Sequence, residues 1–122
     1  MQITTTTIRL RAPDGEMKVH QAQPRGHGKF PAVIVLMEAF GLNDHIKDVA
    51  ERIAREGYVT AAPDLYYRQP QGVVGYDQLE AAIGLMQTLV EEKVIADLRA
   101  VLNHLKAQSF VNGERLGVTG FC

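Results

Sequence analysis

Short apolar runs and segments with helical spacing alternate along the chain. Residues 32–37 form a continuous apolar run after Pro31, which predicts a strand buried on both faces. A second run, residues 58–62, stops before Pro63, and residues 115–119 predict a last strand that leads into Gly120-Phe121-Cys122. An Asn112-Gly113 turn precedes this last strand.

The segments between these strands carry apolar residues at the spacing of an amphipathic helix. The first helix has Asn43 or Asp44 as its N-cap, and Gly57 can end it. A strand, a helix and a strand in succession predict a parallel βαβ unit. Three sets of apolar positions predict three helices, the third of them separate from the second or continuous with it: Ile46, Val49, Ala50, Ile53 and Ala54; Leu79, Ala82, Ile83, Met86 and Val90; Val94, Leu98, Val101, Leu102 and Leu105.

The first 21 residues predict a β-hairpin. Thr4 to Leu10 is rich in β-branched residues, Pro13-Asp14-Gly15 has turn chemistry, and Glu16 to Gln21 can run back beside the first strand. We find no repeat, low-complexity tract or linker. The pattern therefore predicts one α/β domain over residues 1–122, a doubly wound and mostly parallel sheet with an N-terminal antiparallel β-hairpin.

Composition narrows the function classes. The 122 residues include 13 basic and 14 acidic side chains, giving a net charge of −1, so neither nucleic acid nor an anionic membrane is an expected partner. No apolar run approaches the roughly 18 residues of a membrane span, and the N-terminus has no signal-peptide pattern, so we expect a cytoplasmic protein. A single cysteine and four histidines without ligand spacing predict no metal site. No glycine-rich phosphate loop is present after residues 32–37, and we expect no cofactor.

Candidate chemistry lies just after the predicted strands, because ligands of parallel sheets bind beyond the carboxyl ends of the strands. Three segments qualify: residues 38–43, 63–68 and 120–122. The last resembles the first half of a nucleophile elbow, G-x-S-x-G, with cysteine in place of serine. Taken alone, a cysteine that ends a strand is more often a small buried hydrophobe, and Glu38 alone is more often a solvated carboxylate.

Several segments together carry a resemblance to a known family. They are Pro31 to Asn43, His45-Ile46, Asp48-Val49-Ala50, Glu56-Gly57-Tyr58, Ala62-Pro63-Asp64-Leu65-Tyr66, Val111-Asn112-Gly113 and Leu116 to Cys122. In this order and spacing they resemble the N-terminal half of the dienelactone hydrolase family of α/β-hydrolases. The resemblance implies a carboxylic ester hydrolase, similar to carboxymethylenebutenolidase, that cleaves a small lactone or ester through an acyl-enzyme.

The same resemblance assigns roles to residues. Cys122 is then the nucleophile, and Glu38 is the carboxylate that raises the pKa of its thiol until substrate binds. The backbone N–H of Ala39 is an oxyanion donor. Phe40 and Tyr66 follow predicted strands and are candidates to line the substrate pocket, although aromatic residues after strands are at least as often packing residues. We expect Asp64 to brace its loop, because the acid of such a triad follows the nucleophile in sequence.

Two elements of the family pattern are missing from the sequence. In the family, the triad histidine and aspartate follow the nucleophile in sequence. We therefore expect that the chain is truncated at its nucleophile elbow and lacks about 110 to 130 further residues. Without them, we expect the 122 residues to be inactive. His20, His27, His45 and His104 are expected to be satisfied or solvated. Residues 75–82 carry no arginine for a substrate carboxylate, and no motif places Arg68 in the pocket.

Two other function classes remain open. A chain that ends at Cys122 could be a non-catalytic interaction module that pairs through its exposed sheet edge. A flavodoxin-like nucleotide-binding protein is disfavoured, because no glycine-rich loop follows residues 32–37 and Glu38 would repel phosphate. For the hydrolase, we expect a monomer or a homodimer.

Overall fold

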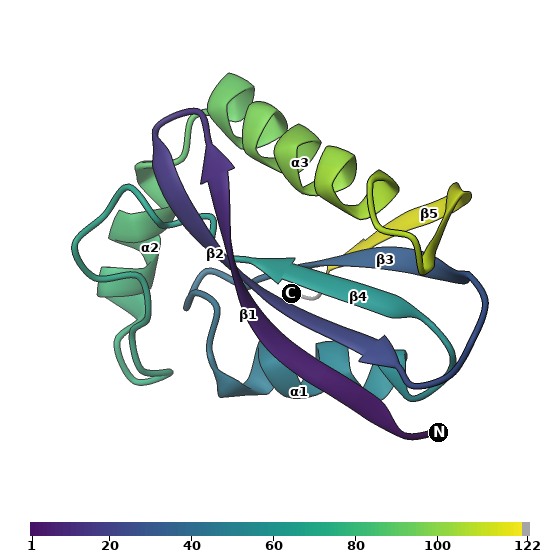
Figure 1. Cartoon of the computed structure of the whole chain (residues 1–122). Coiled ribbons are helices and arrows are strands. Elements are labelled where there is room, and N and C mark those ends of the chain that lie inside the picture. Colours follow the sequence, from purple (N-terminus) through teal and green to yellow (C-terminus); the bar gives the residue numbers. More distant parts are fainter. Residues whose placement is uncertain (121–122) are drawn as a thin grey trace.

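The computed structural model of the chain describes residues 1–120. Within them, strands and helices follow one another in the predicted order (Figure 1). Their bounds are β1 (Ile3–Ala12), β2 (Gly15–Pro24), β3 (Phe30–Leu36), α1 (Asp44–Ala54), β4 (Val59–Pro63), α2 (Leu79–Gln87), α3 (Glu91–Lys106) and β5 (Val111–Gly120).

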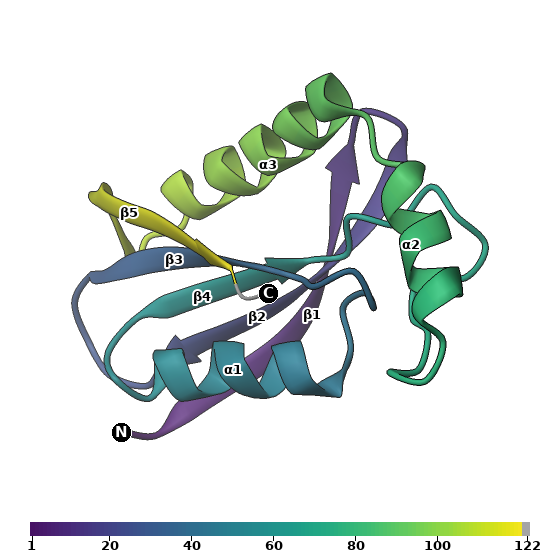
Figure 2. The ribbon, with the colours of Figure 1, turned by 180° about the vertical axis from the view of Figure 1, so that it is seen from behind.

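The strands form one sheet in the order β1-β2-β4-β3-β5. β1 and β2 pair antiparallel as a hairpin, and β2 also runs antiparallel to β4. β3 lies between β4 and β5 and is parallel to both. The carboxyl ends of these three strands therefore meet at one edge of the sheet, where α2 also lies (Figures 1 and 2).

Helices cover both faces of the sheet, as a doubly wound fold requires (Figure 2). On one face, α3 buries Val101 and Leu105 against residues of β2, β3 and β4. On the other face, α1 buries Ile46 and Ala50 against Val35. The predicted α/β class, with its N-terminal hairpin, is confirmed.

The start of α1 follows from its sequence. The Asn43 side chain accepts a hydrogen bond from the Ile46 N–H at 3.0 Å, so Asn43 is the N-cap and Asp44 lies in the first turn. The α-helix itself ends at Ala54, and hydrogen-bonded turns continue to Gly57, whose φ of +104° ends the coil as predicted. Pro63 does not stop β4 but is its last residue, paired with Val19.

The predicted Asn112-Gly113 turn lies inside β5 instead of before it. The pairing of β5 with β3 shifts from Val111–Phe30 to Leu116–Ala32, so β5 has three more residues than β3 between these two pairs. Within this irregular stretch the Asn112 side chain accepts a hydrogen bond from the Glu114 N–H. The turn chemistry was therefore identified correctly, but the strand continues past it.

The helical pattern of residues 79–90 gives α2, which ends at Gln87, before Val90. Ala82 is its buried residue, whereas Leu79, Ile83 and Met86 are exposed. The apolar spacing therefore predicted a helix, but most of its apolar face does not pack into the core of residues 1–120. None of the described helices is long and apolar enough to cross a membrane.

Candidate active site

Glu38 stands at the carboxyl edge of the sheet, directly beyond β3. Leu36 of β3 pairs with Gly120 of β5, and Glu38 follows two residues later in the chain. One of its carboxylate oxygens, Oε1, is buried and has no hydrogen-bond partner among residues 1–120. A buried carboxylate oxygen without a partner is costly, so such a group points to a functional role.

Residues 38–41 form a tight turn that presents Ala39. The Gly41 N–H donates to the Glu38 carbonyl at 3.0 Å, and Ala39 and Phe40 both have negative φ angles. A hydrogen-bonded turn without positive φ at its two central positions is of type I. No backbone carbonyl of residues 1–120 accepts the Ala39 N–H.

Gly41 is required by both its conformation and its neighbours. Its φ is +97°, and a side chain there would collide with the carbonyl oxygen of Gly72. The loop after β4 touches the turn a second time, where the Val74 N–H donates to the Phe40 carbonyl at 3.1 Å. The turn that carries Glu38 and Ala39 is thus held by residues 72–74.

Gly41→Ala is expected to destabilise the protein by about 2 to 4 kcal/mol, because it combines backbone strain with a steric clash. Gly28→Ala is the matched control, since Gly28 has φ +96° but no atom within 4 Å of the place that an alanine side chain would take. We expect only about 1 kcal/mol from this control. Urea unfolding measures both, and equal losses would show that the approach of Gly72 does not constrain the turn.

The loop after β4 is braced by Asp64. Its carboxylate accepts a hydrogen bond from the Tyr66 N–H at 3.0 Å, and burial raises the pKa of Asp64 above its ordinary value. This bond agrees with the bracing role expected from the sequence. Tyr66 is itself buried, and its hydroxyl donates to the Ala39 carbonyl at 2.9 Å.

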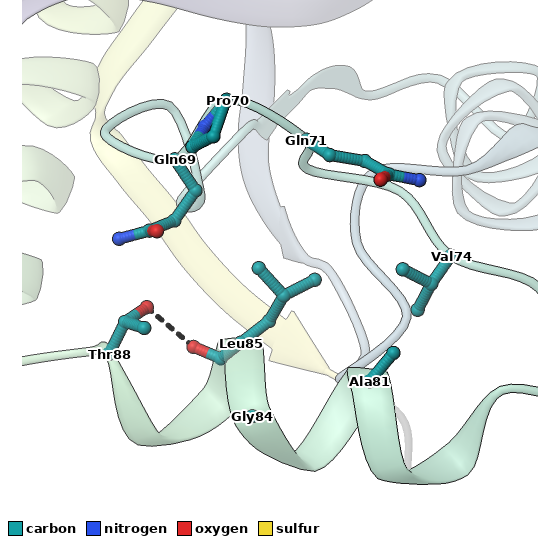
Figure 3. Close-up of a pocket in the computed structure, with 8 residues that line it drawn as sticks. All are labelled: Gln69, Pro70, Gln71, Val74, Ala81, Gly84, Leu85 and Thr88. Atoms are coloured by element: carbon teal, nitrogen blue, oxygen red, sulfur yellow. Dashed lines mark hydrogen bonds between the residues drawn. The ribbon is translucent and has the colours of Figure 1, made fainter.

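Phe40 and a nearby hollow lie on the α2 side of the site. The Phe40 ring packs edge-on against Tyr76, with the ring centroids 4.7 Å apart. A separate pocket of about 370 Å³ opens between residues 69–74 and α2 (Figure 3). Its lining is neutral: Gln69, Pro70, Gln71, Val74, Ala81, Gly84, Leu85 and Thr88.

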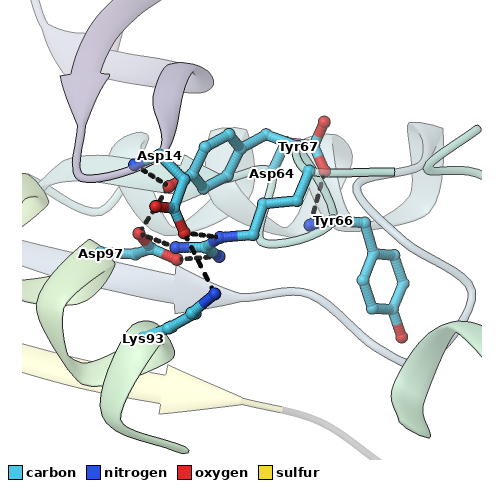
Figure 4. Close-up of polar contacts among 7 residues, drawn as sticks. Asp14, Asp64, Tyr66, Tyr67, Lys93 and Asp97 are labelled. Carbon is cyan, nitrogen blue, oxygen red and sulfur yellow. Dashed lines mark hydrogen bonds and ion pairs between the residues drawn. The ribbon is translucent and has the colours of Figure 1, made fainter. Parts of the chain in front are cut away.

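Sequence reasoning did not identify a polar cluster that includes Asp14, Tyr67 and Asp97 (Figure 4). Arg68 is bound within this cluster. Its guanidinium binds the carboxylate of Asp97, which is fully buried in α3, through two hydrogen bonds of 2.8 and 2.9 Å. It also pairs with Asp14 of the β1–β2 turn and lies over the Tyr67 ring. The hydrogen bonds to Asp97 raise the pKa of Arg68 further above its already high ordinary value.

The histidines have structural or surface positions, as expected. His20 Nε2 lies 2.9 Å from a carboxylate oxygen of Glu51, and His104 Nε2 lies 2.9 Å from the side-chain oxygen of Gln21. Burial lowers the pKa of His104. His27 and His45 are exposed. Among residues 1–120 no group of histidine and acidic side chains could hold a metal ion.

The candidate nucleophile, Cys122, lies outside the described residues. Of the other predicted site residues, the structure brings Glu38, Ala39 and Phe40 into one turn and joins Tyr66 to that turn. Together with the doubly wound sheet, this arrangement places a candidate active site at the carboxyl edge, where open α/β proteins bind their ligands.

Comparison with known proteins identifies the family. The chain matches the dienelactone hydrolase family model over residues 17–122, so it belongs to that family. A Synechocystis protein that carries the name carboxymethylenebutenolidase is 36% identical over 125 residues, covering 100% of this chain and 51% of the relative. The chain thus spans about half the length of this curated relative.

Solved structures agree with this assignment. A Klebsiella pneumoniae protein described as a dienelactone hydrolase superposes with a TM-score of 0.86 at 32% identity, covering 100% of this chain and 51% of the other. A dienelactone hydrolase-like promiscuous phosphotriesterase from metagenomic libraries gives a TM-score of 0.80 at 27% identity, covering 100% and 50%.

Proposed function

We propose that this chain carries the nucleophile of an enzyme that cleaves a small ester or lactone, and that Cys122 is this nucleophile. The observation that carries the proposal is Oε1 of Glu38, which is buried and has no hydrogen-bond partner within residues 1–120. Glu38 follows Leu36 by two residues, and Cys122 follows the paired Gly120 by two residues. This register supports a partnership between the carboxylate and the thiol at neighbouring strand ends.

In the proposed reaction, the Cys122 thiolate attacks the carbonyl carbon of the substrate. The carbonyl oxygen becomes an oxyanion, to which the Ala39 N–H donates. Collapse of this intermediate releases the alcohol, or opens the lactone ring, and leaves an acyl group on sulfur as a thioester. Water then attacks the thioester carbonyl, the C–S bond breaks, and the acyl group leaves as a carboxylic acid while the thiol is restored.

The proton transfers in this scheme need a base. The four histidines of this chain are paired elsewhere or exposed, so we propose that a histidine and an acid outside residues 1–122 supply the base. The 122 residues alone should then be inactive.

The substrate need not carry a carboxylate. Arg68 is bound to Asp97 and Asp14 and is not free to hold a substrate anion. Moreover, α2 carries no arginine or lysine. We therefore propose that an uncharged ester, lactone or thioester is accepted, with Phe40 beside its binding site.

Glu38→Gln should make the thiol more reactive toward iodoacetamide while lowering turnover of p-nitrophenyl acetate. A nearby negative charge disfavours thiolate, so its removal should lower the pKa of the Cys122 thiol and speed alkylation near pH 7 by up to about tenfold. The measurement is the alkylation rate against pH in the complete product of the gene.

Glu56→Gln is the control, because Glu56 is exposed and lies near the start of β4, away from the carboxyl edge. It should leave both the alkylation rate and turnover unchanged. Slower alkylation in Glu38→Gln would contradict the proposed restraint of the thiol, since it would mean that Glu38 activates the sulfur in the resting enzyme.

A further inference from the structure

Tyr66 connects the loop after β4 to the turn that presents Ala39. The Tyr66 side chain is 1% exposed, and its hydroxyl donates to the Ala39 carbonyl at 2.9 Å. Burial raises the pKa of this hydroxyl above its ordinary value, so it stays protonated and remains a donor at neutral pH. A buried hydroxyl that loses its acceptor is costly, so the contact is a firm one.

The geometry of the turn relates this contact to catalysis. Ala39 is the second residue of a type I turn and therefore has helix-like backbone angles. In that conformation the N–H and the carbonyl of one residue point in nearly opposite directions. A donor that holds the Ala39 carbonyl on one side therefore directs the Ala39 N–H to the other side.

We propose that Tyr66 is a positioning residue that orients Ala39 so that its N–H can stabilise the oxyanion. The inference rests on the proposed function and extends it. Tyr66 touches neither substrate nor sulfur in this account. It acts through the Ala39 peptide, and its own backbone N–H is fixed by the Asp64 carboxylate at 3.0 Å.

A neighbouring residue supplies the matched control. Tyr67 also donates its hydroxyl at 2.9 Å, but to the Asp97 carboxylate in the Arg68 cluster. Figure 4 shows the two tyrosine side chains pointing to different sides of the loop. Tyr66→Phe removes the hydrogen bond to the Ala39 carbonyl. Tyr67→Phe removes the bond to Asp97 and the bond accepted from the Asp14 N–H, and it leaves the turn at Ala39 unchanged.

The test compares Tyr66→Phe with Tyr67→Phe in the complete product of the gene, using p-nitrophenyl acetate as substrate. For Tyr66→Phe we expect kcat to fall about tenfold while KM changes less than about twofold, because the oxyanion exists only in the transition state. Affinity for a trifluoromethyl ketone, whose adduct with sulfur carries an oxyanion, should fall by a similar factor. Tyr67→Phe should lower the unfolding midpoint at least as much but leave kcat unchanged.

The outcomes separate this inference from the proposed function. Equal kcat values in the two variants, or a loss in Tyr66→Phe without weaker ketone binding, would overturn the positioning role. If Cys122→Ala retains activity, the proposed function fails instead. If Tyr66→Phe does not fold, Asp64→Asn replaces it, since this weakens the hold on the Tyr66 backbone. Asp64→Asn should then lower both kcat and the affinity for the trifluoromethyl ketone. If neither quantity changes, the positioning role of Tyr66 is overturned.

Discussion

Arg68→Ala is expected to destabilise the protein by about 3 to 5 kcal/mol, although Arg68 takes no part in the proposed chemistry. Asp97 is fully buried in α3, and Arg68 satisfies both of its carboxylate oxygens. Without the guanidinium, the buried Asp97 carboxylate keeps only the Tyr67 hydroxyl as a side-chain partner in the described part of the chain. The free energy of unfolding in urea measures this loss.

Two control variants test whether the unpaired Asp97 carboxylate causes the loss of stability in Arg68→Ala. Arg52→Ala removes an exposed ion pair with Asp48 on α1 and should cost less than about 0.5 kcal/mol. The double variant Arg68→Leu with Asp97→Leu removes both charges and should recover much of the stability lost by Arg68→Ala alone. A loss below about 1 kcal/mol in Arg68→Ala would mean that Asp97 is not held as a buried charge.

Cys122→Ala should reduce hydrolysis of p-nitrophenyl acetate by at least about a thousandfold, the scale seen when a nucleophile is removed from an acyl-transfer enzyme. No other residue of the 122 has a thiol, so iodoacetamide labelling of this part of the protein should disappear with it. Cys122→Ser is a useful comparison, because it keeps a hydroxyl nucleophile of similar size. Activity of Cys122→Ala within about tenfold of the parent would remove the basis of the proposed mechanism.

The architecture followed from the sequence because each buried element left a distinct pattern. The continuous apolar run of residues 32–37 gave β3, and the spacing of Val94, Leu98, Val101 and Leu105 gave α3. Element ends were less certain, since Pro63 can end a strand as its last paired residue and an irregular β5 can contain a turn. The spacing of residues 79–90 correctly predicted a helix, but it did not predict that most of the apolar side chains of this helix are exposed. Helical spacing shows which side chains share a face, and it does not show whether another element packs against that face.

The candidate site was predictable where it depends on strand ends. Glu38 and Ala39 were placed at the carboxyl edge because they follow a buried strand, whereas their proposed roles came from the family resemblance. The pairing of Arg68 with Asp97 joins residues 29 positions apart through the tertiary fold, and no local motif encodes it. One signal was present: Asp97 lies three residues after Val94 and four before Val101, on the apolar face of a helix, where an acid needs a partner.

The link between Tyr66 and Ala39 also depends on tertiary structure. Because Tyr66 follows a predicted strand, we expected it to line the substrate pocket. The burial of its side chain does not test that expectation. The hydrogen bond from its hydroxyl to the Ala39 carbonyl joins two loops from neighbouring strands. Sequence could place both loops at one edge of the sheet, but it could not show which groups meet there.

The most direct test of the central claim is the site of acylation. The complete gene product would be mixed briefly with p-nitrophenyl acetate, quenched in acid to preserve thioesters, digested and analysed by mass spectrometry. We predict an acetyl group on the peptide that contains Cys122, which disappears on longer incubation as the thioester hydrolyses. Acetylation of a different residue during turnover, with Cys122 unmodified, would contradict the account.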